Sequence, residues 1–317
     1  MKNGGGKLKK DLLTLDDIKR EEILKILELT EKLKKDPINN RLKGKVFCLL
    51  FEKPSTRTKI SFESGIQQMG GSTIYMDKTT SQLSRGETVE DTARVLDRYV
   101  DAVVARVFSH KTLEIMSKSM NKHVINALSD LTHPCQILSD LFTIKERFGG
   151  FSGLKLAYVG DGNNVCNSLL LGCSKVGMDI SVACPKGYEP NKGIVKMAKN
   201  YSRITKAKVV VGTEPKSAVK DAKIIYNDAF YSMGDEKEKT KRLKVFIPKY
   251  QVTNKLFKYA APDTVYMHCL PAHRGQEVTS EVIDGPRSIV FDQAENRLHT
   301  QKALLAKMIG PRIKIVY

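Results

Sequence analysis

The stretch F-E-K-P-S-T-R-T-K-I-S-F-E, residues 51–63, decides the fold. It continues an apolar run, residues 46–51, that has the composition of a buried strand and is ended by Pro54. Ser55 is a suitable N-cap for a helix that would run to Gly70-Gly71. A strand that passes directly into a helix is the repeating unit of parallel sheets covered by helices. The stretch therefore predicts a strand-to-helix junction in an α/β protein.

The same alternation continues along the chain. Further strands are expected at residues 73–76, 102–107, 124–127, 156–159, 180–183, 208–211, 224–226, 265–269 and 288–291. Helical patterns occur between them at residues 60–69, 89–99, 134–148, 194–201 and 217–220. A chain of 317 residues is long for a single core. We therefore predict two doubly wound α/β domains, each with a central parallel sheet flanked by helices, and a boundary at Gly149-Gly150.

Bulk composition excludes several classes of protein. No apolar run approaches the roughly 20 residues that span a bilayer, and residues 1–10 lack the apolar core of a secretory signal. The six cysteines form no C-x-x-C pair, so we expect reduced thiols and a cytoplasmic location. The net charge of +18 raises the question of nucleic acid, but lysine and arginine are spread along the chain without a basic stripe. We expect neither a nucleic-acid nor a membrane partner.

The residues S-T-R-T, 55–58, have the chemistry of an anion site. The first backbone N–H groups of a helix lack partners and carry a partial positive charge. Two threonine hydroxyls and the Arg57 guanidinium would add directed donors, which suits a phosphate. The alternative is a plain capping turn with a surface arginine. Because all four residues follow a strand, phosphate binding is the preferred interpretation.

Other polar motifs are expected where ligands of parallel sheets gather, at strand ends and helix starts. His133 and Gln136 in H-P-C-Q share one helix face and could bind a carbonyl and an amide, or could be a solvated helix start. D-G-N-N, residues 161–164, could contact a polar ligand or form a turn. N-D-A-F-Y-S-M-G, residues 227–234, could hold an ammonium and a carboxylate. The charged run at 235–242 is expected to be a mobile, solvated loop.

The motif H-C-L-P, residues 268–271, ends another expected strand. His268 and Cys269 could bind zinc, but no second Cys/His pair has structural spacing, so we expect no metal site. A catalytic Cys–His pair is the sharper alternative. Because adjacent strand residues point to opposite faces, we expect that His268 does not activate Cys269 directly.

Taken together, these motifs resemble those of the aspartate/ornithine carbamoyltransferase family. F-E-K-P-S-T-R-T-x-x-S-F-E, H-P-C-Q, D-G-N-N-V, D-x-x-x-S-M-G and H-C-L-P occur in the family's order and cover nearly the whole chain. Ser-Met-Gly and His-Cys-Leu-Pro mark the ornithine branch, whereas the aspartate branch would show H-P-T-Q and P-L-P. Lys59 departs from the arginine found in many members.

The resemblance implies a fold, a reaction and a set of site residues. Residues 1–148 would bind carbamoyl phosphate, residues 149–299 would bind ornithine, and the terminal helix, 300–317, would pack back on the first domain. The reaction would transfer the carbamoyl group to the δ-amine of L-ornithine, giving L-citrulline and phosphate, in arginine biosynthesis. No metal or organic cofactor is implied, and the family is normally a homotrimer or a multiple of it.

The implied site has two parts. The resemblance assigns carbamoyl phosphate to Ser55, Thr56, Arg57, Thr58, Gln82, Arg106, His133, Gln136, Cys269, Leu270 and Arg297. It assigns ornithine to Asn164, Asp228, Ser232 and Met233. Among these, the implied catalytic residues are Arg57, Arg106, His133, Cys269 and Arg297.

Three rival interpretations stay open. A carbamoyltransferase could use another amine such as putrescine, although Asp228 with Ser232-Met233 favours an unmodified amino acid. A basic nucleic-acid-binding protein could use the fold without catalysis, and should then keep its affinity for DNA when Arg57 is lost. A dehydrogenase is opposed by the incomplete glycine fingerprint at residues 160–164.

Overall fold

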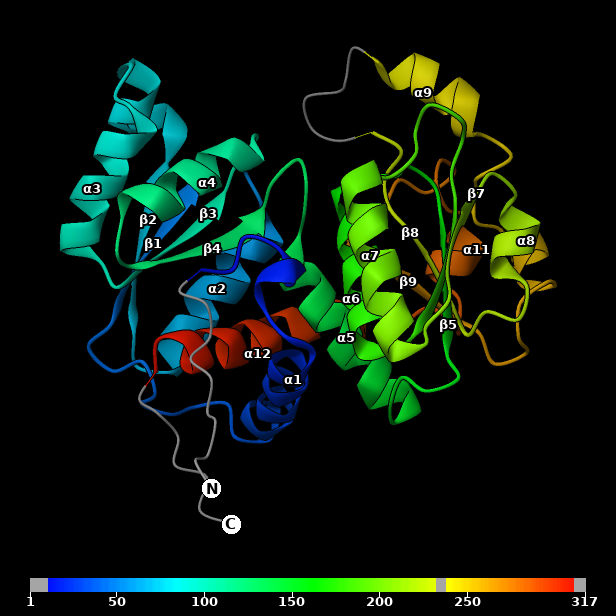
Figure 1. Ribbon diagram of the computed structural model, residues 1–317, viewed down its shortest axis with the longest axis horizontal. Coiled ribbons are helices and arrows are strands. Elements are labelled where there is room, and N and C mark those ends of the chain that lie inside the picture. Colours follow the sequence, from blue (N-terminus) through cyan, green and yellow to red (C-terminus); the bar gives the residue numbers. More distant parts are fainter. Residues whose placement is uncertain (1–10, 232–237, 311–317) are drawn as a thin grey trace. The chain divides into compact units, whose positions relative to one another are not determined.

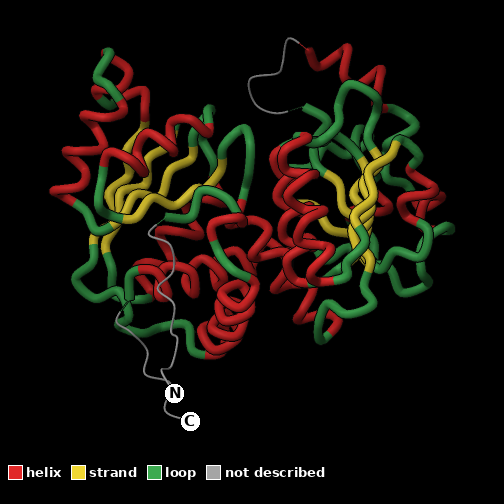
Figure 2. Tube along the Cα trace, viewed as in Figure 1, coloured by secondary structure: helices red, strands yellow, loops and turns green. Residues whose placement is uncertain are grey.

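The computed structural model describes residues 11–231 and 238–310. Two compact units contain these residues: unit 1 comprises 11–138 and 297–310, and unit 2 comprises 139–296. Figure 2 shows strands at the centre of each unit with helices around them. Every strand pair in both sheets is parallel. The predicted fold class, two parallel sheets flanked by helices, is confirmed.

Unit 1 contains a four-stranded sheet in the order β2-β1-β3-β4 (Figure 1). Its elements are α1 Arg20–Lys35, β1 Val46–Phe51, α2 Thr56–Gln68, β2 Ser72–Asp77, α3 Val89–Tyr99, β3 Ala102–Arg106, α4 His110–Ser119 and β4 His123–Leu128. Short 3-10 turns follow β2, namely η2 Lys78–Thr80 and η3 Gln82–Arg85. Cys48, Leu50, Val103, Leu113 and Met116 belong to one buried cluster, which places α4 against one sheet face. Successive side chains of a strand point to opposite faces of the sheet, and the buried side chains on this face pack against α4.

Unit 2 contains a five-stranded sheet in the order β7-β6-β5-β8-β9. Its strands are β5 Lys155–Val159, β6 Asp179–Ala183, β7 Val209–Gly212, β8 Ile224–Asn227 and β9 Val265–His268. Its helices are α6 Asn164–Val176, α7 Lys192–Thr205, α8 Pro215–Val219, α9 Lys239–Phe246, α10 Asn254–Phe257 and α11 Ser280–Ile283. Strand order reverses direction at β5 and β8, so the carboxyl ends of these strands form the usual ligand edge of a doubly wound sheet.

Two long helices run across the division between the units. α5 Pro134–Phe148 contains the division after Leu138, and α12 Val290–Met308 contains the division after Asn296. The predicted boundary lay at Gly149-Gly150, where Gly149 has φ 78° and ends α5. A glycine marks where a helix ends. The compact units are instead defined by which residues pack together, and the packing partners of α5 change after Leu138, inside the helix. Residues 311–317 of the predicted terminal segment lie outside the described residues.

The strand expected at residues 288–291 is wrong. Ser288 makes an isolated bridge to Tyr266, and α12 begins at Val290. Val290 is buried while Phe291 is 70% exposed, as one face of a helix requires. A short apolar run has no periodicity of its own that separates strand from helix.

The solvated loop expected at 235–242 is also wrong for its last part, since α9 begins at Lys239. Its residue Phe246 is fully buried and gives the charged segment an apolar anchor. No helix among the described residues is both long and apolar enough to cross a membrane.

Candidate active site

The mouth of α2 in unit 1 has the geometry of an anion site. Ser55 is the N-cap, and its hydroxyl accepts a hydrogen bond from the Thr58 amide (3.4 Å), as predicted from the sequence. Thr58 is buried, whereas Thr56 is exposed and Arg57 is half-buried. The remaining N–H groups of this first turn leave a partial positive charge at the end of β1.

A buried arginine joins three elements of unit 1. Arg297 of α12 donates from Nη1 to Gln136 Oε1 of α5 (2.5 Å). From Nη2 it donates to the Thr58 hydroxyl of α2 (3.5 Å). Gln136 is 1% exposed and Arg297 is 4% exposed, so the guanidinium charge is largely removed from water. The structure thus brings together three of the predicted site residues from positions far apart in the chain.

His133 belongs to the same part of unit 1. Burial lowers its pKa well below the ordinary value, and the positive charges of Arg297 and Arg106 lower it further. Arg106 is the last residue of β3 and is 8% exposed. The imidazole is therefore neutral near pH 7, where it can donate one hydrogen bond without adding a third positive charge.

Gln301 was missed by the sequence analysis. With its amide oriented to satisfy its neighbours, it accepts from Arg297 Nε (3.0 Å) and Nη2 (2.8 Å) and donates to Ser61 Oγ (2.7 Å). It lies four residues after Arg297 on α12, on the same helix face. That spacing was the available signal, and it gained meaning only once Arg297 was known to be buried.

Two further predicted residues stand apart from this cluster. The side chains of Arg57 and Gln82 make no hydrogen bond to it within the described part of the chain. Gln82 begins η3, after β2, and is exposed. Their assignments stay predictions that rest on the resemblance.

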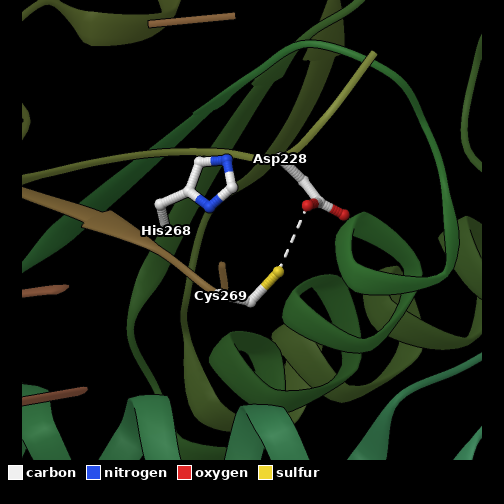
Figure 3. Close-up of side chains that lie close together, drawn as sticks. All are labelled: Asp228, His268 and Cys269. Atoms are coloured by element: carbon white, nitrogen blue, oxygen red, sulfur yellow. Dashed lines mark hydrogen bonds between the residues drawn. The ribbon is translucent and has the colours of Figure 1, made fainter. Parts of the chain in front are cut away.

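In unit 2, a second polar cluster lies at the carboxyl ends of β8 and β9 (Figure 3). The Asp228 carboxylate accepts from the Ala229 amide (2.8 Å) and from the Asn163 side chain (2.8 Å). The Cys269 thiol donates to the same carboxylate (3.2 Å), the contact drawn as a dashed line in Figure 3. Asp228 is thus a fixed negative group at the edge of the sheet.

Asn163, which the resemblance did not assign, is the asparagine that contacts Asp228. It is the N-cap of α6, and its Oδ1 accepts from the amides of Val165 (3.0 Å) and Cys166 (3.1 Å). Its amide group is thereby turned toward Asp228. The predicted residue Asn164 is the first residue of α6 and is half-buried.

Glycine at position 162 is required by close packing. A Cβ there would lie 2.2 Å from the Pro190 backbone nitrogen, and the Gly162 amide donates to the Tyr188 carbonyl (2.9 Å). D-G-N-N is therefore a tight turn that places an N-cap asparagine, not a dinucleotide loop.

His268 is fully buried between two other groups. Its Nδ1 accepts from the Leu270 amide (2.9 Å), and its Nε2 lies 3.4 Å from Glu277 Oε1. β9 ends at His268 and Leu270 has a φ of 59°, so strand alternation does not extend past His268. The expectation that His268 does not activate Cys269 directly stays a prediction, and both ring nitrogens of His268 face groups other than the thiol. One ligand atom each from Asp228, His268 and Cys269 lies within 4.8 Å of the others (Figure 3).

These three ligand atoms have a spacing that a metal ion could bridge. Binding through His268, however, would break its hydrogen bond to Leu270 or its contact with Glu277. The absence of a metal in the reaction therefore stays an expectation. Two other ornithine residues, Ser232 and Met233, lie outside the described residues.

Comparison with known proteins identifies the family. Residues 10–146 match the family model for the "Aspartate/ornithine carbamoyltransferase, carbamoyl-P binding domain". Residues 152–308 match the model for the "Asp/Orn binding domain". The chain belongs to the aspartate/ornithine carbamoyltransferase family. It is therefore an enzyme, a carbamoyltransferase, as the motifs predicted.

Named relatives cover almost the whole chain. The ornithine carbamoyltransferase of Bacillus subtilis is 51% identical over 300 residues, which is 95% of this chain and 94% of the relative. That of Thermococcus kodakarensis is 50% identical over 308 residues, 95% of this chain and 96% of the relative. The solved structure of ornithine carbamoyltransferase from Pyrococcus furiosus has a TM-score of 0.91 at 49% identity, covering 95% of this chain and 97% of that one.

Proposed function

We propose that this carbamoyltransferase transfers the carbamoyl group of carbamoyl phosphate to the δ-amine of L-ornithine, giving L-citrulline and phosphate. The observation that carries the proposal is the buried cluster of Thr58, Gln136 and Arg297 beside a neutral His133. Relatives about half identical over nearly their full length are named ornithine carbamoyltransferases, which favours ornithine over putrescine.

The proposed reaction is a direct displacement. The neutral δ-amine forms a C–N bond to the carbamoyl carbon, the C–O bond to phosphate breaks, and the proton lost by the amine passes to the departing phosphate. Arg57 and Arg106 would stabilise the charge on the leaving phosphate. The neutral His133 would donate to the carbamoyl oxygen as negative charge develops there. Gln136 and Gln301 would hold the Arg297 guanidinium in place, so that little reorganisation is needed during the reaction.

Ornithine would be held chiefly by charge. Its α-ammonium would pair with the Asp228 carboxylate, which Asn163 and the Ala229 amide already fix in position. Cys269 would contact the amine through the same polar cluster and would not be acylated. Because the δ-amine reacts only without its extra proton, activity should increase toward alkaline pH.

The wider setting is proposed on coarser grounds. All six cysteines are free thiols, which suits a cytoplasmic enzyme of arginine biosynthesis. A homotrimer or a multiple of it is proposed from the family resemblance, and we propose that no metal or organic cofactor takes part.

An acceptor panel tests the proposed function. Carbamoyl phosphate is offered with ornithine, putrescine, lysine or aspartate, while phosphate release and product mass are followed. We expect ornithine to give citrulline and phosphate in equal amounts, with a kcat/KM at least about 100-fold above the other amines. A comparable kcat/KM for putrescine or aspartate would move the acceptor assignment, and no release with any amine would refute the proposal.

A further inference from the structure

We propose that Glu52, which is assigned no role above, is a positioning residue for the carbamoyl phosphate site. Its carboxylate ties together the carboxyl ends of β2, β1 and β3. Each of these ends leads to a predicted phosphate-site residue: Gln82 after β2, Ser55 after β1 and Arg106 at the end of β3. The inference rests on the proposed function, since it concerns how that site is held.

The sheet register places Glu52 between the two neighbouring strands. Phe51 is aligned with Asp77 on one side and with Arg106 on the other. Glu52 is therefore the first residue beyond the sheet in the central strand, and its amide donates to the Arg106 carbonyl (2.8 Å). The backbone of Glu52 therefore lies between the carboxyl ends of β2 and β3.

The Glu52 side chain uses this position in both directions. One carboxylate oxygen accepts from the Phe108 amide (2.7 Å), two residues beyond Arg106. The other pairs with the Lys78 ammonium (2.9 Å), the first residue after β2. The Glu52 side chain is only 6% exposed, whereas the Lys78 side chain is 40% exposed, so the carboxylate is buried and its lysine partner reaches it from the surface. Lys53 adds to the same joint, because its ammonium lies 4.3 Å from the centre of the Phe108 ring.

Charge balance explains why the carboxylate needs Lys78. A negative group three residues before Ser55 would weaken a site built to hold a phosphate. The Lys78 ammonium neutralises it and leaves the positive end of α2 and the guanidinium of Arg106 in control of the local field. Glu52 thus holds three strand ends together, and Lys78 neutralises the Glu52 charge that would otherwise repel the phosphate.

The amino ends of strands in the same sheet offer a matched control residue, Asp101. Asp101 accepts from the Val46 amide (3.0 Å) and pairs with the Lys45 ammonium (2.9 Å). This carboxylate joins β1 and β3 at their amino ends, with one backbone donor and one lysine, as Glu52 does at the carboxyl ends. Asp101 is therefore equivalent in chemistry but remote along the strands from the predicted site residues.

The experiment compares Glu52→Ala with Asp101→Ala in the full chain. We measure the melting temperature, the affinity for inorganic phosphate by calorimetry, and the KM values for carbamoyl phosphate and ornithine. Both variants should lower the melting temperature. Only Glu52→Ala should raise the phosphate Kd and the KM for carbamoyl phosphate, by about tenfold, because a loosened site loses orientation. The KM for ornithine at saturating carbamoyl phosphate should stay within about twofold of wild type.

A second pair of variants guards against misfolding of Glu52→Ala. Lys78→Met leaves the Glu52 charge uncompensated and should raise the phosphate Kd by about threefold or more. Adding Glu52→Gln to Lys78→Met removes that charge and keeps an acceptor for the Phe108 amide, so it should restore part of the affinity. If Glu52 had a purely structural role, adding Glu52→Gln to Lys78→Met would not recover phosphate affinity.

The outcomes separate the inference from the proposed function. A wild type that neither binds phosphate nor turns over carbamoyl phosphate with ornithine refutes the proposed function. If the wild type does both, equal phosphate affinity in wild type and Glu52→Ala overturns only the role of Glu52. An equal loss of phosphate affinity in Asp101→Ala also overturns the role of Glu52. If Glu52→Ala does not fold, an unchanged phosphate affinity in Lys78→Met overturns it instead.

Discussion

His133 shows how one buried side chain couples chemistry to pH. Its pKa is lowered by burial and by Arg297 and Arg106. Above its ordinary value of 6.5 it is neutral in both the folded and unfolded chain and contributes no pH dependence. Below that value the unfolded chain takes up a proton that the folded chain refuses, so stability falls as pH falls.

We therefore expect that replacing His133 makes the free energy of unfolding less sensitive to acid. Between about pH 7.5 and about pH 5.5, wild type should lose about 1 kcal/mol more unfolding free energy than His133→Gln, which cannot titrate. Urea unfolding at both pH values measures the difference. An identical loss in the two proteins would mean that His133 is not held neutral by the fold.

Cys269 offers a second test at the level of one residue. The Cys269 thiol donates a hydrogen bond to the Asp228 carboxylate, which holds it as a contact within the polar cluster of unit 2. Cys269→Ser keeps a donor of similar size and should retain turnover, reduced about 10- to 100-fold, with weaker ornithine binding. Mass spectrometry of the wild type with carbamoyl phosphate alone should show no adduct. A kinetically competent carbamoyl group on Cys269 would establish covalent catalysis instead.

At the scale of elements, α9 contacts both the loop after β5 and the loop after β8 in unit 2. Arg242 donates from Nε to the Phe230 carbonyl (2.6 Å), after β8, and forms an ion pair with Asp161, after β5. Its guanidinium also lies 4.9 Å from the centre of the Tyr188 ring. The hydrogen bond from Asn163 to Asp228 joins the same two loops, so Arg242 supports the group proposed to bind ornithine.

Arg242→Met should therefore act on one substrate. Methionine keeps much of the apolar stem but loses the ion pair and the hydrogen bond. We expect the KM for ornithine to rise about tenfold while the KM for carbamoyl phosphate is unchanged. Lys249→Met, which removes an exposed ion pair with Glu214 in the same unit, is the control and should change neither. Equal effects on both substrates would indicate a general loss of structure.

The elements also show what sequence patterns can and cannot predict. β1 and α3 were predicted with their observed bounds because periodicity and capping are local properties. The start of α12 was misassigned because Ser288 to Phe291 is too short to reveal a period. The contacts of Gln301 and Asn163 depend on helices and loops distant in sequence. Side-chain partners of this kind follow from packing and have no local signature.

At the scale of the whole molecule, the excess of positive charge is broadly distributed. Described pairs such as Lys35–Glu31 and Arg94–Asp91 are exposed contacts within single helices and add little stability each. The net charge of +18 instead favours the approach of an anionic substrate. Steering of this kind requires no nucleic-acid partner.

We propose that each of the two units binds one of the two substrates. The buried cluster of Thr58, Gln136 and Arg297 lies in unit 1, and the Asp228 cluster lies in unit 2. The family models assign carbamoyl phosphate binding to residues 10–146 and Asp/Orn binding to residues 152–308. Arg297 falls in the second range although it contacts Thr58 and Gln136 in unit 1.

The most direct test measures the KM of each substrate in two variants, Arg57→Ala and Asp228→Asn. Arg57→Ala should reduce kcat/KM for carbamoyl phosphate about 30- to 1000-fold, since it removes a charged contact made in the transition state. Asp228→Asn should raise the KM for ornithine and leave the KM for carbamoyl phosphate within about twofold of wild type. We expect each variant to affect mainly one substrate. Near-normal activity of Arg57→Ala, or an equal weakening of both substrates in Asp228→Asn, would contradict the assignment of one substrate to each unit.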